Sequence, residues 1–155
     1  MPCNVINNPS FEAGLSSWYS STPGVATIGT GDIAYSGSSY LDLETTVSAS
    51  EATISQDLYW LDDEKTHNLT VQVRLLDPIS SADSCTVSAY LGDEYTADSD
   101  IASEIIWNAG EWISLTGTIL PEQRDTVLNL VGACTFSGDV QTAHVLFDDV
   151  VFSDC

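Results

Sequence analysis

Positive charge is scarce in this sequence. Lys65, Arg74 and Arg124 face 23 Asp and Glu residues, and the formal net charge at pH 7 is −20. A surface of that sign repels nucleic-acid phosphates and anionic lipids, so we expect neither nucleic acid nor membrane among the partners. The acidic residues are spread along the chain, which argues against a disordered acidic tail. The charge therefore indicates a soluble surface, with a cationic ligand such as chitosan as the rarer alternative.

Long apolar runs and catalytic motifs are also missing. No apolar run approaches the roughly 18 residues that a membrane-spanning helix requires. The sequence has no GxSxG, no HExxH and no Cys–His arrangement, and its two histidines, His67 and His144, stand apart. Among 23 acidic residues, some carboxylate pair falls at glycosidase separation by chance, so such pairs carry no weight. We expect a protein that is not an enzyme.

Cysteine occurs four times, as Cys3, Cys85, Cys134 and Cys155, and never as a CxxC pair. This spacing suits disulfides in an oxidising compartment better than zinc. Three pairings are possible, and we favour Cys3 with Cys155, because the ends of a β-sandwich lie near each other, and Cys85 with Cys134. Asn68 begins a glycosylation acceptor sequence, and no signal peptide precedes the first expected strand. We expect a mature, secreted, extracellular glycoprotein.

Alternation of apolar and polar residues dominates the chain and indicates strands with one buried face. The clearest cases are residues 69–75, 85–91 and 112–117. Further strands are expected at 3–6, 25–29, 40–46, 51–58, 126–136 and 143–152. The segment 99–107 has isoleucines at helical spacing, and helix, loop and strand all stay open there. About ten strands predict an all-β, jelly-roll β-sandwich of two antiparallel sheets, as a single domain over residues 1–155.

Five short landmarks occur in a fixed order along the chain. They are residues 4–12 followed by Gly14-Leu15 and Trp18, then 35–41, 54–58, 110–112 and 147–150. In this order the chain resembles the carbohydrate-binding modules of families four and nine, the cellulose-binding jelly-roll type. The resemblance implies a non-catalytic module that recognises a plant or fungal cell-wall polysaccharide, such as a β-glucan. Such a module would attach the protein itself, or a parent enzyme with an appended catalytic domain, to that polysaccharide.

Members of that family hold a structural calcium ion between the N-terminal segment and the last strand. Carried over, the ligands are backbone carbonyls near Ser10 and Gly37 with the carboxylates of Glu12 and Asp148. Calcium takes six to eight oxygen ligands and accepts this mixture. Asp148 and Asp149 point to opposite faces of a strand, and we prefer Asp148 as the ligand. The alternative is that these are ordinary surface acids.

The sugar cleft of that family crosses the outward face of one sheet, where aromatic rings and planar polar groups bind sugars. Alternation turns Asp57, Gln72 and Arg74 outward, and we expect them to form a hydroxyl clamp; a salt bridge on an exposed sheet is the alternative. Trp18 and Trp112 are expected in the core. The candidate sugar platforms are Trp60, Tyr90, Tyr95 and Trp107. Among the aromatic residues at strand ends and in loops, we favour Trp107 and Tyr95.

The strand at 126–136 argues against a deep polar groove. Its outward residues include only two that form hydrogen bonds, Asn129 and Thr135. A second function therefore stays open, namely a secreted structural or adhesive β-sandwich that keeps the fold without binding sugar. We expect a monomer in either case.

Overall fold

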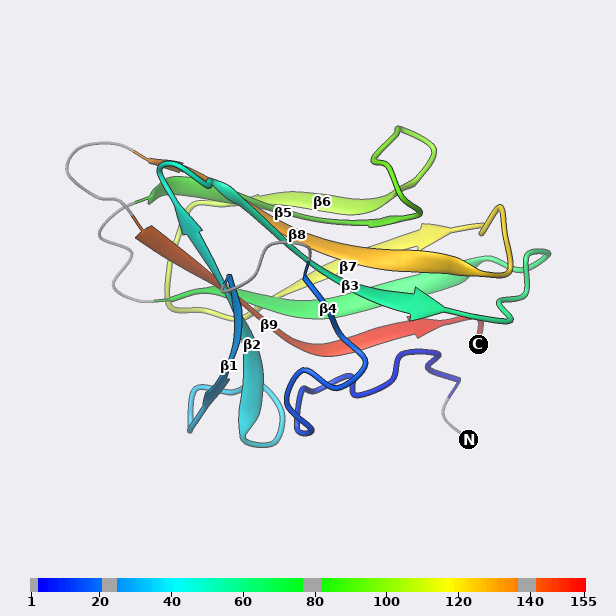
Figure 1. Cartoon of the computed structure of the whole chain (residues 1–155), viewed down its shortest axis with the longest axis horizontal. Helices are drawn as coiled ribbons and strands as arrows, with labels where there is room; N and C mark the ends of the chain where they lie inside the picture. Colours follow the sequence, from blue (N-terminus) through cyan, green and yellow to red (C-terminus); the bar gives the residue numbers. More distant parts are fainter. Residues whose placement is uncertain (1–2, 21–24, 77–81, 137–141) are drawn as a thin grey trace.

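The computed structural model describes residues 3–20, 25–76, 82–136 and 142–155. These residues form nine strands in two antiparallel sheets (Figure 1). The five-stranded sheet has the order β1 (Ala26–Thr30), β2 (Ser39–Thr46), β9 (Thr142–Ser153), β4 (His67–Leu75) and β7 (Ile113–Ile119). The four-stranded sheet has the order β3 (Glu51–Leu58), β8 (Thr126–Phe136), β5 (Ala82–Leu91) and β6 (Asp100–Ile106). In the described part of the chain, no helix is long and apolar enough to cross a membrane.

The predicted two-sheet sandwich is confirmed, because alternate residues of both sheets meet in one core. Leu69, Val71, Val73 and Leu75 on β4 are all at most 1% exposed. The residues between them point to the outer face, as the period of two requires. The segment whose state was left open, 99–107, contains strand β6 at the edge of the four-stranded sheet.

The strand expected at 3–6 is wrong, since only an isolated bridge joins Asn4 to Ser153. Strand β2 pairs with β9 only as far as Phe147, and the N-terminal segment lies beside the rest of β9. The Asn4 side chain supplies part of the pairing there. It donates to the carbonyl of Val150 at 2.9 Å and accepts from the backbone N–H of Phe152 at 2.8 Å. Side-chain hydrogen bonds thus replace a regular ladder.

The N-terminal segment crosses from one sheet to the other. It bridges to β9 at Asn4 and to β3 through Tyr19 and Ser55. Between these points Phe11 and Trp18 enter the core, with 0% and 5% exposure. Gln56, on the inner face of β3, holds the segment by accepting from the backbone N–H of Asn7 and donating to its carbonyl, at 2.8 and 2.9 Å. A buried amide is therefore fully paired with backbone.

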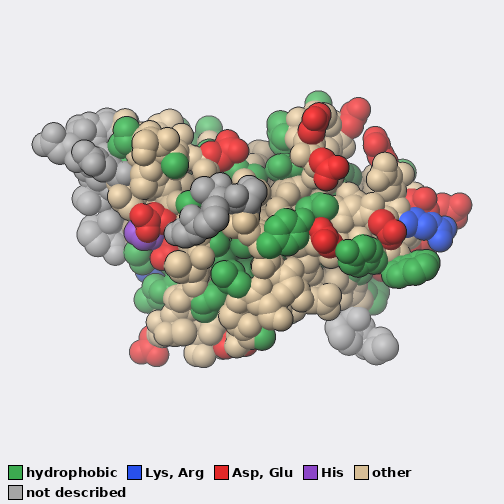
Figure 2. Space-filling view, in the orientation of Figure 1, with side chains coloured by type: hydrophobic (Ala, Val, Ile, Leu, Met, Phe, Trp, Pro, Cys, Tyr) green, Lys and Arg blue, Asp and Glu red, His purple; other side chains and the backbone are tan. Residues whose placement is uncertain are grey.

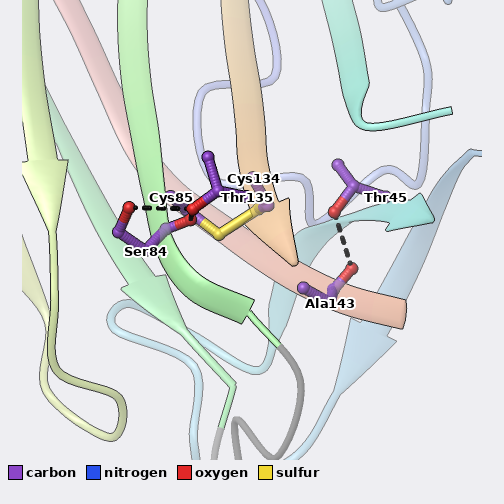
Figure 3. The surroundings of a disulfide bond; sticks show 6 residues. All are labelled: Thr45, Ser84, Cys85, Cys134, Thr135 and Ala143. Atoms are coloured by element: carbon purple, nitrogen blue, oxygen red, sulfur yellow. Dashed lines mark hydrogen bonds between the residues drawn. A yellow bond between two sulfur atoms is a disulfide. The ribbon is translucent and has the colours of Figure 1, made fainter. Parts of the chain in front are cut away.

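Both favoured disulfides are present. Cys3–Cys155 joins the two ends of the chain, which lie close together at the lower right of Figure 1. Cys85–Cys134 joins directly opposed residues of β5 and β8, whose Cα atoms are 4.0 Å apart. Figure 3 shows this bond beside the hydroxyl pair of Ser84 and Thr135, whose oxygens are 3.2 Å apart. The second disulfide therefore staples two strands of the four-stranded sheet.

Strand β9 contains a bulge that explains the Phe147-Asp148-Asp149-Val150 landmark. Gln72 of β4 pairs with Asp148, whereas Thr70 pairs with Val151, so one residue of β4 opposes two of β9. Asp149 is the extra residue, with a φ of 50°, a left-handed conformation that Asp tolerates. The bulge lets Phe147 and Val150 both enter the core although they are three positions apart.

Candidate functional site

The outer face of the four-stranded sheet, which points away from the five-stranded sheet, carries side chains in rows across the strands. The strand register aligns Ser55, Asn129 and Tyr90 in one row. The next two rows are Thr53, Val131, Ser88 and Ser103, and then Glu51, Ala133, Thr86 and Ile105. A hollow of about 330 Å³ lies on this face, and we call it the sheet-face hollow. Its lining residues are Glu51, Thr86, Ser88, Tyr90, Tyr95, Ser103, Val131 and Ala133.

Two tyrosines stand at one side of the sheet-face hollow. Tyr90 comes from β5 and Tyr95 from the loop between β5 and β6, and their rings meet edge to face with centroids 5.6 Å apart. Tyr95 is 56% exposed, while Tyr90 is partly buried. Burial, followed by the charges of Glu51 and Asp93, raises the pKa of Tyr90, so its hydroxyl stays protonated at neutral pH. Aromatic surface with neighbouring hydroxyl groups is a surface that suits a sugar ring.

Strand β8 contributes little polar surface to this hollow. Asn129 is 6% exposed, and its amide oxygen accepts from the Ser55 hydroxyl at 2.6 Å. Its nitrogen donates to the carbonyl of Gly92 at 2.7 Å, which ties the start of the β5–β6 loop to the sheet. The Thr135 hydroxyl likewise forms its hydrogen bonds within the sheet, to Ser84 on the neighbouring strand. The hydroxyl groups that line the hollow therefore come from β5, β6 and the loop between them, and Val131 and Ala133 form an apolar floor.

A second hollow, of about 440 Å³, lies at the end of the sandwich near the β5–β6 loop. Asp57 and Tyr59 belong to its lining. The Asp57 carboxylate accepts from the hydroxyl of Tyr19 at 2.8 Å and from that of Tyr59 at 3.4 Å. Burial and the neighbouring Asp57 raise the pKa of Tyr19 to about 12. Four further acids line this end hollow: Asp93, Asp98, Glu122 and Asp125.

The predicted clamp of Asp57, Gln72 and Arg74 is wrong. Asp57 lies on the four-stranded sheet, whereas Gln72 and Arg74 lie on the five-stranded sheet. Gln72 is only 6% exposed and accepts from the Ser114 hydroxyl at 3.0 Å. Among the described residues, no carboxylate lies within ion-pair distance of Arg74, whose buried Nε has no hydrogen-bond partner. Alternation identified three outward side chains but not the sheet to which each strand belongs.

The loop between β1 and β2 covers part of the outer face of the five-stranded sheet. Trp112 donates its indole N–H to the carbonyl of Ile33 at 2.8 Å and packs edge to face on Tyr35. Beneath this loop Leu146 and Asp148 are both 0% exposed, although they point away from the central core. The prediction of a core position is confirmed for Trp18 but wrong for Trp112, which is half-buried and anchors the covering loop.

The two predicted tryptophan platforms lie apart from both tyrosines. Trp60 is 87% exposed at the end of β3, where its backbone N–H donates to Asp125 at 3.1 Å. Trp107 is 65% exposed and follows β6, beyond the Cys85 end of β5. Tyr95 precedes β6, so the strand separates Tyr95 from Trp107. Of the four predicted sugar platforms, the structure brings only Tyr90 and Tyr95 into contact.

Several residues in or beside the two hollows were missed, and alternation already pointed to some of them. Tyr19 directly follows the buried Trp18, so in an extended segment its ring had to face outward. Glu51 is exposed at the start of β3. The position of Tyr59 beside Asp57 also follows from alternation, since residues two apart in an extended segment share a face.

Two of the predicted calcium ligands, Glu12 and Asp148, accept hydrogen bonds from the turn formed by residues 36–39. Glu12 accepts from the backbone N–H groups of Ser38 and Ser39, at 2.7 and 3.1 Å, and these bonds lower its pKa. Asp148 accepts from Ser36 at 2.9 Å, and burial raises its pKa. Gly37 has a φ of 62°, and an added Cβ there would overlap the Glu12 carboxylate. Ser10 and Glu12 lie in two successive turns of the N-terminal segment.

This turn brings two carboxylates together, one from the first landmark and one from the last. The described residues contain no group of three or more His, Cys, Asp or Glu side chains that could hold a metal ion. Asp149, as the bulge residue, does not join Asp148 at the turn but donates its backbone N–H to it at 2.7 Å. A cation here would therefore rely on two carboxylates and on backbone oxygens.

Comparisons with known proteins agree with this architecture. Solved structures that are similar over nearly their whole length include TmCBM61 in complex with β-1,4-galactotriose, with 14% identity, a TM-score of 0.67, and coverage of 98% of this chain and 99% of that chain. The CBM22-1 xylan-binding domain from Paenibacillus barcinonensis Xyn10C has 22% identity, a TM-score of 0.62, and coverage of 93% and 90%. A cyclase from Fischerella sp. TAU has 17% identity, a TM-score of 0.67, and coverage of 96% and 94%. At such identities the likeness shows the fold alone.

No curated protein matches the sequence. The family model described as a carbohydrate binding domain, CBM_4_9, matches residues 3–131, which is most of the chain. The matched range includes four of the five landmarks and strands β1 to β7, and it ends within β8. The chain therefore belongs to the CBM_4_9 family of carbohydrate-binding domains.

Proposed function

We propose that this chain is a non-catalytic carbohydrate-binding module that binds a cell-wall polysaccharide, such as a β-glucan, in the sheet-face hollow. The observation that carries the proposal is the meeting of Tyr90 and Tyr95 beside a row of hydroxyl groups on an open sheet face. One ring presents its edge to the other, so the pair forms a corner rather than a flat platform. A sugar packed into this corner buries its apolar face on one ring and meets the second at its side.

The proposed absence of catalysis is supported by the lining of the hollow. Glycoside hydrolysis commonly uses two carboxylic acids, and Glu51 is the single one among the described lining residues. The cyclase among the similar structures shows that this fold also occurs in an enzyme. Incubation of the domain with each glycan that it binds, followed by product analysis, tests this part. Turnover above the no-protein control would contradict it.

Targeting of a parent enzyme is part of the proposal. One similar structure, with 17% identity and a TM-score of 0.68, contains CBM22-1 and GH10 modules of a Clostridium thermocellum xylanase, and this chain corresponds to 29% of its length. The two disulfides support a secreted location, because an oxidising compartment preserves them. Asn68, proposed as a glycosylation site, is exposed near the start of β4. Its outward position leaves the sheet-face hollow on the opposite sheet free.

Affinity electrophoresis tests the proposed binding most simply. The domain is run through gels that contain β-glucan, xylan, mannan, galactan or no polysaccharide, together with the Tyr95→Ala and Trp107→Ala variants. We expect one neutral glycan to retard the wild type and Trp107→Ala equally, and Tyr95→Ala to migrate as in the empty gel. Equal retardation of all three proteins would place the site elsewhere. No retardation in any gel would favour the structural or adhesive function, which the apolar outer surface of β8 also suits.

We also propose a structural calcium ion at the turn formed by residues 36–39, held by Glu12, Asp148 and backbone carbonyls near Ser10 and Gly37. Asp148 is fully buried, and its oxygens accept two backbone N–H groups but meet no cation among the described residues. A buried carboxylate without a compensating charge is costly, and a bound cation would remove that cost. When bound, calcium supplies a cross-link between the first and last landmarks. Glu12 stays ionised because backbone N–H groups favour its charged form.

A further inference from the structure

The sheet-face hollow carries charge of one sign only, which is negative, among the described residues that line it. Among the described residues that line it, Glu51 is the only charged side chain. Beside the hollow, the β5–β6 loop adds Asp93 and Glu94, both exposed, next to Tyr95. Figure 2 shows acidic side chains gathered on this loop, which projects above the four-stranded sheet at the upper right. Every charge near the hollow is therefore negative.

The three cations of the chain lie away from this hollow. Lys65 pairs with Asp62 at 3.4 Å and Arg124 pairs with Asp63 at 3.2 Å, beyond the end of β3. Arg74 lies on the five-stranded sheet. None of them lines the sheet-face hollow. An anionic group on a ligand would find no partner there, whereas an ammonium group would.

Glu51 and the tyrosine corner bracket the hollow. Glu51 lies two rows from Tyr90, which corresponds to roughly 13 Å along the strands. A sugar chain that rests on Tyr90 and Tyr95 and continues along the sheet meets Glu51 with a later residue. The charge of Glu51 also reaches across the hollow, since it contributes to the raised pKa of Tyr90. Glu51 is thus placed to contact substituents of a sugar residue rather than to pack against its ring.

We propose that Glu51 determines the ligand class of this hollow, so that sugars bearing an amino group bind more tightly than neutral sugars, and uronic acids bind most weakly. This inference rests on the proposed function of the same hollow. The order follows from charge alone, because one carboxylate attracts an ammonium group, is indifferent to a hydroxymethyl group and repels a second carboxylate. Its size follows from the exposure of Glu51, since a pair of charges about 7 Å apart changes affinity by about threefold at the dielectric constant of water and by about tenfold at an effective dielectric constant of about 35.

Titration calorimetry with three oligosaccharides of one backbone tests the inference. The probes are hexamers of β-1,4-linked glucose, glucosamine and glucuronic acid, at pH 6 and low salt. We expect the wild type to bind them in the order glucosamine, glucose, glucuronic acid. In Glu51→Gln the ratio of glucosamine to glucose affinity should fall by about threefold to tenfold. High salt should reduce the same ratio in the wild type, because it screens an exposed charge.

Glu44→Gln is the matched control, because it removes one negative charge from the outer face of the five-stranded sheet. It should keep the wild-type ratio. An equal ratio in wild type and Glu51→Gln, or an equal loss in both variants, would overturn the role of Glu51. Binding of glucose hexamer with no preference among the three probes would overturn the inference and leave the proposed function intact. Binding of none of the probes would overturn the inference, whereas the proposed function would fail only if the gels with xylan, mannan and galactan also gave no retardation.

Discussion

The two outer faces of this sandwich arise from the same alternating sequence pattern, but part of one face is covered by a loop and the other carries an open hollow. On the five-stranded sheet, the outward residues Gln72 and Asp148 are buried beneath the β1–β2 loop, which Trp112 anchors. On the four-stranded sheet, Tyr90 and Tyr95 border an open hollow. Alternation specifies that a side chain leaves the central core, and long-range contacts decide whether another segment covers it. The covered face stabilises the fold, and the open face is available to a ligand.

Removal of the anchor should affect the covered face most strongly. Trp112→Ala deletes a half-buried indole, its hydrogen bond to Ile33 and its contact with Tyr35. We expect a loss of about 2 to 3 kcal/mol in the free energy of unfolding, below the range for a fully buried Trp. Urea denaturation measures it. Trp107→Ala, with a ring that is 65% exposed, should stay within about 0.5 kcal/mol of the wild type. Equal losses in the two variants would show that the loop is not anchored by Trp112.

Calcium should stabilise the covered face and leave the open face unchanged. If the ion binds at Glu12 and Asp148, a hundredfold excess over its dissociation constant raises the free energy of unfolding by about 2.7 kcal/mol. Thermal unfolding with calcium and with chelator measures this shift. Asp148→Asn should abolish the shift, whereas Asp149→Asn, at a left-handed position that Asn also tolerates, should keep it. A melting temperature that is insensitive to calcium in the wild type would contradict the proposal.

The pH dependence of stability should separate Glu12 from Asp148 in the presence of chelator. The pKa of Glu12 is lowered in the folded state, so its contribution is present above its unfolded value and is lost as the pH falls through its folded value. The pKa of Asp148 is raised by burial, so its ionisation opposes folding as the pH rises above the unfolded value. The difference in melting temperature between wild type and Glu12→Gln should therefore shrink from pH 7 to pH 3. A constant difference over this range would show that the carboxylate charge does not act through the turn.

A small effect is also expected at Trp60. Its ring is 87% exposed and belongs to neither hollow. Trp60→Gly, which suits the left-handed φ of 62° at this position, should change the free energy of unfolding by less than about 1 kcal/mol. Glycan affinity, measured by calorimetry, should equal that of the wild type. A tenfold loss of affinity would make Trp60 part of the site.

Much of the sandwich follows from the sequence because strand periodicity is a local signal. The inward positions of Cys85 and Val87 and the outward position of Tyr90 were all predictable from the period of two. The bulge at Asp149 was not, because the two adjacent acids give no sign that one of them lacks a partner on β4. The strand expected at 3–6 failed for a related reason, since the Asn4 side chain takes over backbone pairing.

The site was less predictable than the fold because it depends on which strands become neighbours. Asp57 and Arg74 both point outward, and only the sheet order shows that they face opposite directions. Tyr95 meets Tyr90 because the β5–β6 loop turns back over the sheet, where Asn129 holds the start of the loop. No periodicity within a single strand contains that information.

The most direct test of the central claim is a titration of isotope-labelled protein with the glycan identified by affinity electrophoresis, followed by amide chemical shifts. The account predicts the largest shift changes at Thr86, Ser88 and Ser103 around the sheet-face hollow. It predicts no change at Gln72 and Ser114 on the five-stranded sheet. Shift changes that are confined to the five-stranded sheet, or to the residues around Trp60 or Trp107, would contradict it.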